Sequence, residues 1–242
     1  MKHDDFRPVP KAIVRAMPAA MSGFSLLEVS MVLLIMGLLL GSVVQPFGAQ
    51  LLDRQRAQTR SQLYDIRDAV VGYIVANHRM PCPLNSTISS EQGCSSHHGF
   101  VPADTLGIEG SINEQGALLD SWGQPIFYSV TDTDSDGDGL ADFTTVQGMQ
   151  NAGMQELSPD FEICSAAAGC GRLRANQVPL VLVSSGSRVA DLSTDELENT
   201  DLDNRFVSRD IDQSGDAQFD DIVVWLSESV LYAQLIQARV LP

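Results

Sequence analysis

The sequence predicts an α+β protein in which a long N-terminal hydrophobic helix packs on a small antiparallel-sheet head domain with disulfides. Three observations predict this arrangement. Residues 24–44 form an apolar run that carries one charge, and apolar side chains continue at helical spacing to about residue 77. From residue 80 onward, short apolar runs are broken by Pro, Gly, Ser and Asp, which is typical of strands and turns. The four cysteines lie in two local pairs.

The N-terminal region predicts a leader followed by a membrane helix. Four basic residues within residues 1–23 predict that the amino end stays cytoplasmic and that the rest is periplasmic. At about 1.5 Å per residue, residues 24–44 are long enough to span a hydrocarbon core of about 30 Å. We therefore expect a leader over residues 1–23, a transmembrane and then amphipathic helix over residues 24–77, and a periplasmic head domain over residues 78–242.

The polar-to-apolar junction at Gly23 and Phe24 precedes the apolar run, so cleavage there leaves the helix on the mature chain. Glu28 lies inside this run, where an ionisable group costs a few kcal/mol unless it finds a partner. The segment Gly23-Phe24-Ser25-Leu26-Leu27-Glu28 resembles the class III signal of type IV pilins and type II secretion pseudopilins. The resemblance implies that a prepilin peptidase cuts after Gly23 and methylates the new amine of Phe24. It also implies that Glu28 pairs with the amino terminus of a neighbouring subunit during assembly.

Phrases of the head extend the resemblance to pseudopilins over most of the chain. They are Met80-Pro-Cys-Pro83, Gly99-Phe-Val-Pro102, Asp120-Ser-Trp-Gly-Gln-Pro125 and Phe219-Asp-Asp-Ile-Val-Val-Trp225.

Apolar runs predict strands in the head at residues 126–130, 179–183 and 205–208. A last helix is predicted over residues 222–239, with Asp220 or Asp221 as its cap; a strand at 222–225 is the alternative.

The cysteines pair locally as Cys82 with Cys94 and Cys164 with Cys170. An even set of this kind is typical of proteins that oxidise outside the cytoplasm. Zinc is the competing interpretation, although neither pair has the close spacing of a zinc knuckle.

Two aspartate-rich stretches predict calcium sites, because alternating carboxylates and turn-forming glycines let several oxygens converge on one hard cation. The first stretch offers Asp132, Asp134, Asp136, Asp138 and Asp142, and it resembles the calcium loops of dockerin and thrombospondin repeats. The second stretch offers Asp210, Asp212, Ser214, Asp216 and Asp221 at EF-hand-like spacing.

The resemblance to pseudopilins also implies calcium at the second stretch, because major pseudopilins bind calcium near a similar Asp-Ile-x-x-Trp motif. Asp221-Ile-Val-Val-Trp225 matches this motif, whereas Arg188 lies near where the family's upstream aspartate would fall. The alternative for both stretches is a solvated acidic turn.

The resemblance implies a structural subunit, either a minor pilin or a pseudopilin, of a type IV pilus or a type II secretion filament. Its implied partners are other pilin or pseudopilin subunits, prepilin peptidase and the inner-membrane assembly platform, and its implied location is the inner membrane or the filament. The formal net charge of −16 disfavours nucleic acid as a partner.

The alternative is an uncleaved, membrane-anchored, calcium-binding adhesin or ligand-binding module. An enzyme is not expected. The serines of residues 184–187 do not form a hydrolase elbow, and His97 and His98 are interpreted as surface residues of a Ser/Gly-rich loop.

Overall fold

The structure, a computed structural model, describes residues 23–84, 88–89, 93–212 and 218–241, without the side chains of residues 41–47. It comprises two compact units, Met1–Ala49 and Gln50–Pro242, which we call the N-terminal unit and the head unit. The elements in chain order are α1 (Leu26–Asn77), β1 (Ile88–Ser89), β2 (Gly93–Cys94), β3 (His98–Phe100), α2 (Ala103–Leu106), β4 (Phe127–Val130), α3 (Gly148–Glu156), β5 (Phe161–Cys164), the 3₁₀ turn η1 (Ala168–Cys170), β6 (Leu173–Val178), β7 (Leu180–Ser184), α4 (Thr194–Glu198), β8 (Arg205–Val207), β9 (Ile222–Leu226) and α5 (Glu228–Gln237).

The N-terminal unit contains the first part of α1. Ser25 caps the helix, because its Oγ accepts a hydrogen bond of 3.3 Å from the backbone N–H of Leu27. Glu28 lies in the first turn, where a carboxylate interacts favourably with the positive end of the helix dipole. The described apolar side chains of this unit are exposed, for example Phe24 at 82% and Leu26 at 92%.

The predicted fold class needs a correction at this helix. Among the residues that the structure describes, no helix contains a stretch both long and apolar enough to cross a membrane. The expected transmembrane segment within residues 24–77 is therefore not found.

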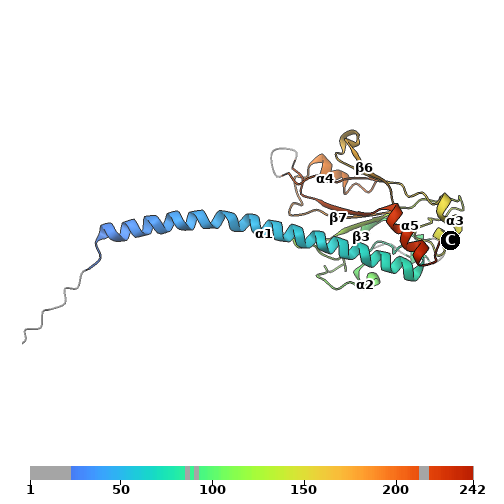
Figure 1. Ribbon diagram of the computed structural model, residues 1–242, viewed down its shortest axis with the longest axis horizontal. Coiled ribbons are helices and arrows are strands. Elements are labelled where there is room, and N and C mark those ends of the chain that lie inside the picture. Colours follow the sequence, from blue (N-terminus) through green and yellow to red (C-terminus); the bar gives the residue numbers. More distant parts are fainter. Residues whose placement is uncertain (1–22, 85–87, 90–92, 213–217, 242) are drawn as a thin grey trace, which may run out of the picture. The chain divides into compact units, whose positions relative to one another are not determined.

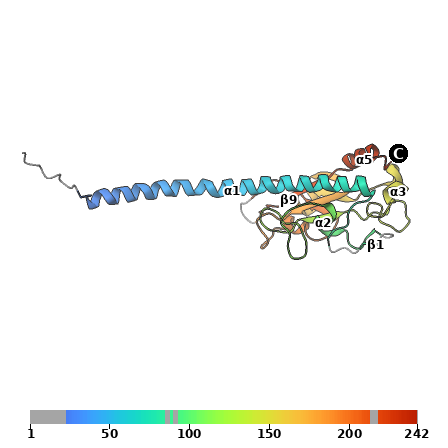
Figure 2. The ribbon, with the colours of Figure 1, turned by 90° about the horizontal axis from the view of Figure 1, so that it is seen from below.

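The head unit is built around a four-stranded antiparallel sheet of order β3-β4-β7-β9. One face of this sheet is covered by the second half of α1, which contributes four apolar side chains no more than 1% exposed: Leu63, Ile66, Val70 and Ile74. Their spacing of three and four residues places them on one face of the helix. Figure 1 and Figure 2 both show α5 alongside this half of α1, and Leu231 and Leu235 of α5 join the same core.

Residues of β7 alternate between two cores. Leu180 and Leu182 pack with α1 and α5, whereas Val181 and Val183 pack against Phe161 and the rest of a second core. This second core lies against a three-stranded sheet of order β6-β5-β8. β5 and β8 run parallel, so the expectation of antiparallel pairing throughout is wrong for this sheet.

All three predicted strands are confirmed within one residue of their ends, as β4, β7 and β8. The predicted helix over residues 222–239 is wrong in its first part, because residues Ile222–Leu226 form β9 and the helix begins only at Glu228. β9 pairs with β7 along its whole length, and its alternating burial suits a strand with a core on each face. The alternative of a strand at 222–225 is therefore the correct one.

Both cysteine pairs form disulfides, Cys82–Cys94 and Cys164–Cys170. The first ties the segment after α1 to β2, and the second closes the turn between β5 and β6. The four sulfurs are thus not available as thiolate ligands, which argues against the zinc interpretation.

Candidate functional site

The residues of the predicted signal lie at the start of the N-terminal unit. Gly23 and Phe24 precede α1, and Glu28 follows one turn into it. Phe24, Glu28, Val29, Val32 and Leu33 line a shallow hollow on this part of the chain. Phe24 and Glu28 are thus close together beside an exposed apolar helix surface.

The first aspartate stretch forms an exposed loop in which three carboxylates converge. One oxygen from each of Asp134, Asp136 and Asp138 lies within 4.8 Å of the others. Backbone N–H groups hold these side chains in place: Gly137 and Asp138 donate to Asp134 Oδ1, and Gly139 donates to Asp134 Oδ2. Three fixed carboxylates at this separation provide the hard oxygen ligands that calcium prefers.

The other two predicted ligands of this stretch have separate surroundings. The carboxylate of Asp132 lies 3.9 Å from Nδ1 of His97. Asp142 is buried, and its Oδ2 accepts a hydrogen bond of 2.7 Å from the backbone N–H of Ser135. Burial raises the pKa of Asp142 above its ordinary value despite this hydrogen bond. The structure therefore brings three of the five predicted ligands together.

His97 and His98 are partly buried, so the expectation of two surface histidines is wrong. His98 belongs to β3, where its Nδ1 lies 3.0 Å from Ser129 Oγ and its ring lies 5.8 Å from that of Phe161. Burial lowers the pKa of both histidines, because it disfavours the charged imidazolium.

The second aspartate stretch is divided between two places. Asp210 is exposed, and Asp212 exchanges backbone hydrogen bonds with Phe219. Ser214 and Asp216 lie outside the described residues. Asp221 is buried just before β9, where it lies with Glu196 and Asp220.

Asp221 belongs to a group of three buried carboxylates, Glu196, Asp220 and Asp221, which we call the buried carboxylate cluster. One oxygen from each lies within 4.8 Å of the others, and the three residues are 1%, 6% and 4% exposed. Hydrogen bonds hold each one. Glu196 Oε1 accepts from the backbone N–H of Asp220 at 3.1 Å, and Asp221 Oδ2 accepts from Asn199 Nδ2 at 2.7 Å.

Sheet pairing and a helix cap bring the cluster together. β7 and β9 pair with Ser184 opposite Ile222, so the segment after β7 meets the residues before β9. Ser187 then donates to Asp220 Oδ2 from its backbone N–H and its hydroxyl, at 3.0 and 2.6 Å. The close approach requires Gly186, which has a φ of +64° and where an added Cβ would lie 2.5 Å from the carbonyl oxygen of Asp220.

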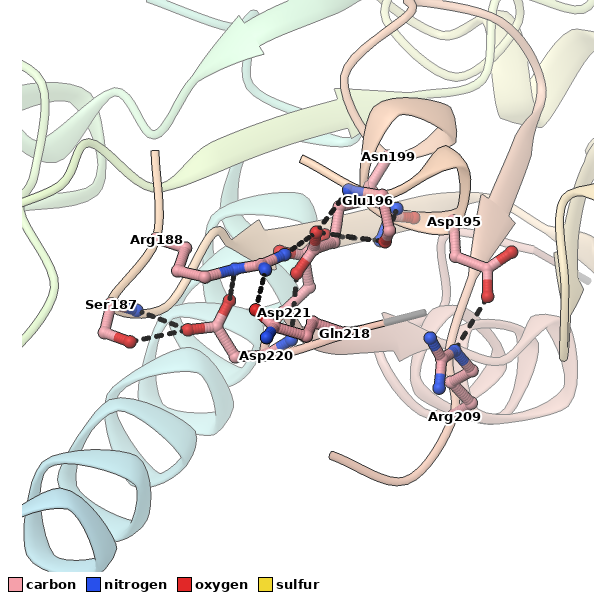
Figure 3. Close-up of polar contacts among 10 residues, drawn as sticks. Ser187, Arg188, Asp195, Glu196, Asn199, Arg209, Gln218, Asp220 and Asp221 are labelled. Atoms are coloured by element: carbon pink, nitrogen blue, oxygen red, sulfur yellow. Dashed lines mark hydrogen bonds and ion pairs between the residues drawn. The ribbon is translucent and has the colours of Figure 1, made fainter. Parts of the chain in front are cut away.

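Glu196 enters the cluster from α4. Ser193 and Glu196 form a capping box, in which the Ser193 backbone N–H donates to Glu196 Oε2 at 2.7 Å. The capping box holds the Glu196 carboxylate at the start of α4, against the backbone of Ser193. Figure 3 shows Glu196 and Asn199 reaching from α4 toward Asp221.

Arg188 supplies the positive charge at this cluster (Figure 3). Its Nη2 donates to Glu196 Oε2, and its Nε lies 3.9 Å from Asp220 Oδ1. Its Nη1 donates to Gln218, which fixes the other end of the guanidinium. A single arginine thus contacts two of the three carboxylates.

The cluster shifts the pKa of its acids in opposite directions. Burial alone would raise the pKa of Glu196, but hydrogen bonds from Ser193 and Asp220, together with the charge of Arg188, lower it below its ordinary value. Burial raises the pKa of Asp221 to about 7, and the neighbouring charges of Glu196 and Asp220 act in the same direction. Asp221 therefore exchanges its proton near neutral pH.

Sequence reasoning missed Arg188, Glu196, Asn199 and Asp220 as members of one site. The capping-box spacing of Ser193 and Glu196 was a visible signal for the helix start. It did not show which carboxylates Glu196 would join, because the contacts reach from α4 to residues near β9.

We expect Asp221→Asn to reduce the pH dependence of stability. The folded chain holds a proton on Asp221 up to a pH of about 7, whereas the unfolded chain releases it near its ordinary pKa of 3.8. The stability that the protonated Asp221 contributes is present in full below about pH 4 and is lost as pH rises through 7. The free energy of unfolding of the variant, measured by urea titration from pH 5 to 7, should thus fall less steeply, by up to about 1.4 kcal/mol per pH unit.

Asp210→Asn is the matched control, because Asp210 is exposed and lies outside the cluster. It should leave the slope unchanged. Equal slopes for Asp221→Asn and the unmodified chain would contradict the raised pKa of Asp221, which is caused mainly by burial and further by the charges of Glu196 and Asp220.

Known proteins provide no template for these sites. Comparison of the chain with protein-family models, with curated proteins and with solved structures finds no match in any of the three. The function must therefore be argued from the residues and their geometry.

Proposed function

We propose that this chain is a prepilin-like structural subunit, a minor pilin or pseudopilin, of a type IV pilus or type II secretion filament. The observation that carries the proposal is the exposed apolar surface of α1 in the N-terminal unit, together with the carboxylate of Glu28 near its start. In this proposal, the N-terminal helices of neighbouring subunits pack together in the filament.

The apolar surface of this helix needs a partner. Leu27 is 78% exposed, Leu33 is 65% exposed and Leu40 is 66% exposed, and similar side chains lie between them. Soluble monomers rarely expose contiguous apolar patches larger than a few hundred Å², and burying one leucine contributes about 1.5–3 kcal/mol. A second helix of the same kind offers a matching apolar surface, so helix-to-helix packing between subunits would cover it.

Glu28 would select the register of that packing. A carboxylate buried among apolar helices is costly unless a cation neutralises it. Cleavage after Gly23 would create a charged amine at Phe24, and the amine of a neighbouring subunit could then pair with Glu28. The processing step and the assembly step are chemically linked in this proposal, because the first creates the partner of the second.

The disulfides support a head located outside the cytoplasm. Disulfides persist in oxidising compartments such as the bacterial periplasm, and the head unit contains two of them. We therefore propose a periplasmic or filament location for the head.

Processing at Gly23 is tested by the mass of the mature chain. Expressed with a prepilin peptidase, the chain should begin at Phe24 and carry one methyl group on its amino nitrogen. Mass spectrometry of the intact protein and of its N-terminal peptide measures both changes. Without the peptidase, or with Gly23→Leu, the chain should keep residues 1–23. A mature chain that retains residues 1–23 in the presence of the peptidase would contradict the proposal.

Assembly is tested at Glu28. Glu28→Gln keeps the length of the side chain and removes its charge, so it should leave an amine unpaired at each subunit contact. Because breaking one partner of a buried ion pair costs about 3–5 kcal/mol, we expect at least a tenfold loss of subunit from sheared filaments. The thermal unfolding of the head should not change.

Glu28→Asp is the matched variant, since it keeps the charge on a shorter side chain. It should assemble better than Glu28→Gln. Equal incorporation of Glu28→Gln and unmodified subunits would show that the carboxylate has no role in assembly.

A second candidate function, a calcium-binding adhesin or ligand-binding module that keeps residues 1–23, is favoured by the loop of Asp134, Asp136 and Asp138. Calcium fits the donor set of this loop: three exposed carboxylates whose orientation is already set by backbone hydrogen bonds. Calcium binding is compatible with either function, and we propose it for both. The mass of the mature N terminus separates them.

Calcium should stabilise the chain through this loop. Binding at a concentration one hundred times the Kd adds about 2.7 kcal/mol to the free energy of unfolding. We expect a higher Tm in calcium than in chelator, measured by scanning calorimetry. Asp136→Asn with Asp138→Asn should remove the difference, because an amide oxygen still accepts the backbone hydrogen bonds but carries no charge.

Asp132→Asn is the control, since Asp132 lies beside His97 and outside the three converging carboxylates. It should retain the response to calcium. Identical Tm values for the unmodified chain in calcium and in chelator would exclude a stabilising calcium site in this loop.

A further inference from the structure

We infer that the guanidinium of Arg188 takes the place of a divalent cation in the buried carboxylate cluster, so that the folded head holds Glu196, Asp220 and Asp221 together without a metal ion. Removal of Arg188 should then uncover a latent calcium site. The inference concerns the head unit alone and does not depend on the proposed filament function.

The cluster requires a cation of some kind. Three carboxylates with oxygens within 4.8 Å of one another, each at least nine-tenths buried, repel one another and lose most of their hydration. Neutral hydrogen-bond donors such as Ser187 and Asn199 satisfy individual oxygens without cancelling the charge. A positive charge beside the carboxylates offsets the repulsion that these neutral donors leave.

Arg188 provides this charge from the segment after β7. Its side chain is about three-quarters buried, and its guanidinium lies against Glu196 and Asp220. Calcium takes six to eight oxygen ligands at 2.3–2.6 Å, and a guanidinium offers no oxygen. Since Glu196 Oε2 already accepts from Arg188, calcium cannot bind this oxygen while the arginine stays in place. The calcium site implied by the Asp221-Ile-Val-Val-Trp225 motif therefore does not fit this head.

Two carboxylate oxygens show that the arginine does not satisfy the whole cluster. Asp220 Oδ1 and Asp221 Oδ1 are buried and accept no hydrogen bond from any described residue. Both belong to carboxylates that could bind a metal ion. A guanidinium extends in one plane and contacts Glu196 and Asp220, whereas an ion at the centre could contact all three residues.

The cluster borders a cavity at Asp220. A cavity of about 130 Å³ is lined by Arg188, Ser187 and Asp220, among other residues. Truncation of Arg188 would enlarge this cavity toward the carboxylates. Calcium could then enter from solvent with part of its hydration shell.

The experiment uses the full chain with Asp136→Asn and Asp138→Asn, so that the exposed aspartate loop no longer contributes. In this background, calcium should neither bind by titration calorimetry nor change the Tm. Adding Arg188→Ala should lower the Tm in chelator by about 5–15 °C, because it leaves buried charges unpaired. Calcium at millimolar concentration should restore at least half of that loss, and a further Glu196→Gln should abolish the restoration.

Arg209→Ala is the matched control. Arg209 is another partly buried arginine of the head, with its Nε 2.7 Å from Asp195 (Figure 3). Its guanidinium lies over the ring of Phe219. Its removal should lower the Tm but create no response to calcium. Arg188→Lys, which keeps a positive charge, should also remain unresponsive.

Two results would overturn the inference. The first is that calcium binds the chain that carries Asp136→Asn and Asp138→Asn but keeps Arg188, and that Glu196→Gln removes this binding. The other is an Arg188→Ala chain whose stability calcium does not change. If Arg188→Ala does not fold in chelator, refolding is followed as calcium is added, and Arg188→Gln is tested in parallel. Recovery of the folded state supports the latent site, and failure of both variants to recover at any calcium concentration rejects it.

Discussion

The contact between one face of α1 and the four-stranded sheet is the constraint on which the head depends. Leu63, Ile66, Val70 and Ile74 present a continuous apolar stripe, which packs in one core with Tyr128, Leu180 and Leu182 of the sheet. Once this face is covered, β7 and β9 are buried on both sides and must alternate between two cores. The position of the strands, and therefore of the loops at their ends, follows from this packing.

The buried carboxylate cluster is a consequence of the same sheet. Antiparallel pairing of Ser184 with Ile222 brings the end of β7 beside the start of β9. Arg188 and Asp220 are separated by a long stretch of chain but meet at this edge, and the capping box of α4 adds Glu196. Packing of the sheet thus brings Arg188, Glu196 and Asp220 into contact. The stability of this cluster depends on the charge of Arg188.

The two acidic sites of the head differ in how they are built. Asp134, Asp136 and Asp138 are close in the chain, exposed and held by hydrogen bonds within their own loop, so water screens their repulsion. The buried cluster draws its members from separate elements and has little water to screen them. The first arrangement is screened by water without a counter-ion, whereas the second needs a permanent counter-charge. The structure provides that counter-charge as a side chain.

Local patterns in the sequence determined the end of α1 at Asn77, the strands β4, β7 and β8, and the short disulfide loops, because each depends on residues within one turn, strand or loop. Hydropathy predicted a membrane span, whereas no helix among the described residues is long and apolar enough to cross a membrane. Tertiary structure decided that residues 222–226 form a strand, since pairing with β7 outweighs their helical spacing. It also decided that Asp221 joins Glu196 and Arg188 rather than Asp210, because charges distant in the chain become neighbours only when the sheet is packed.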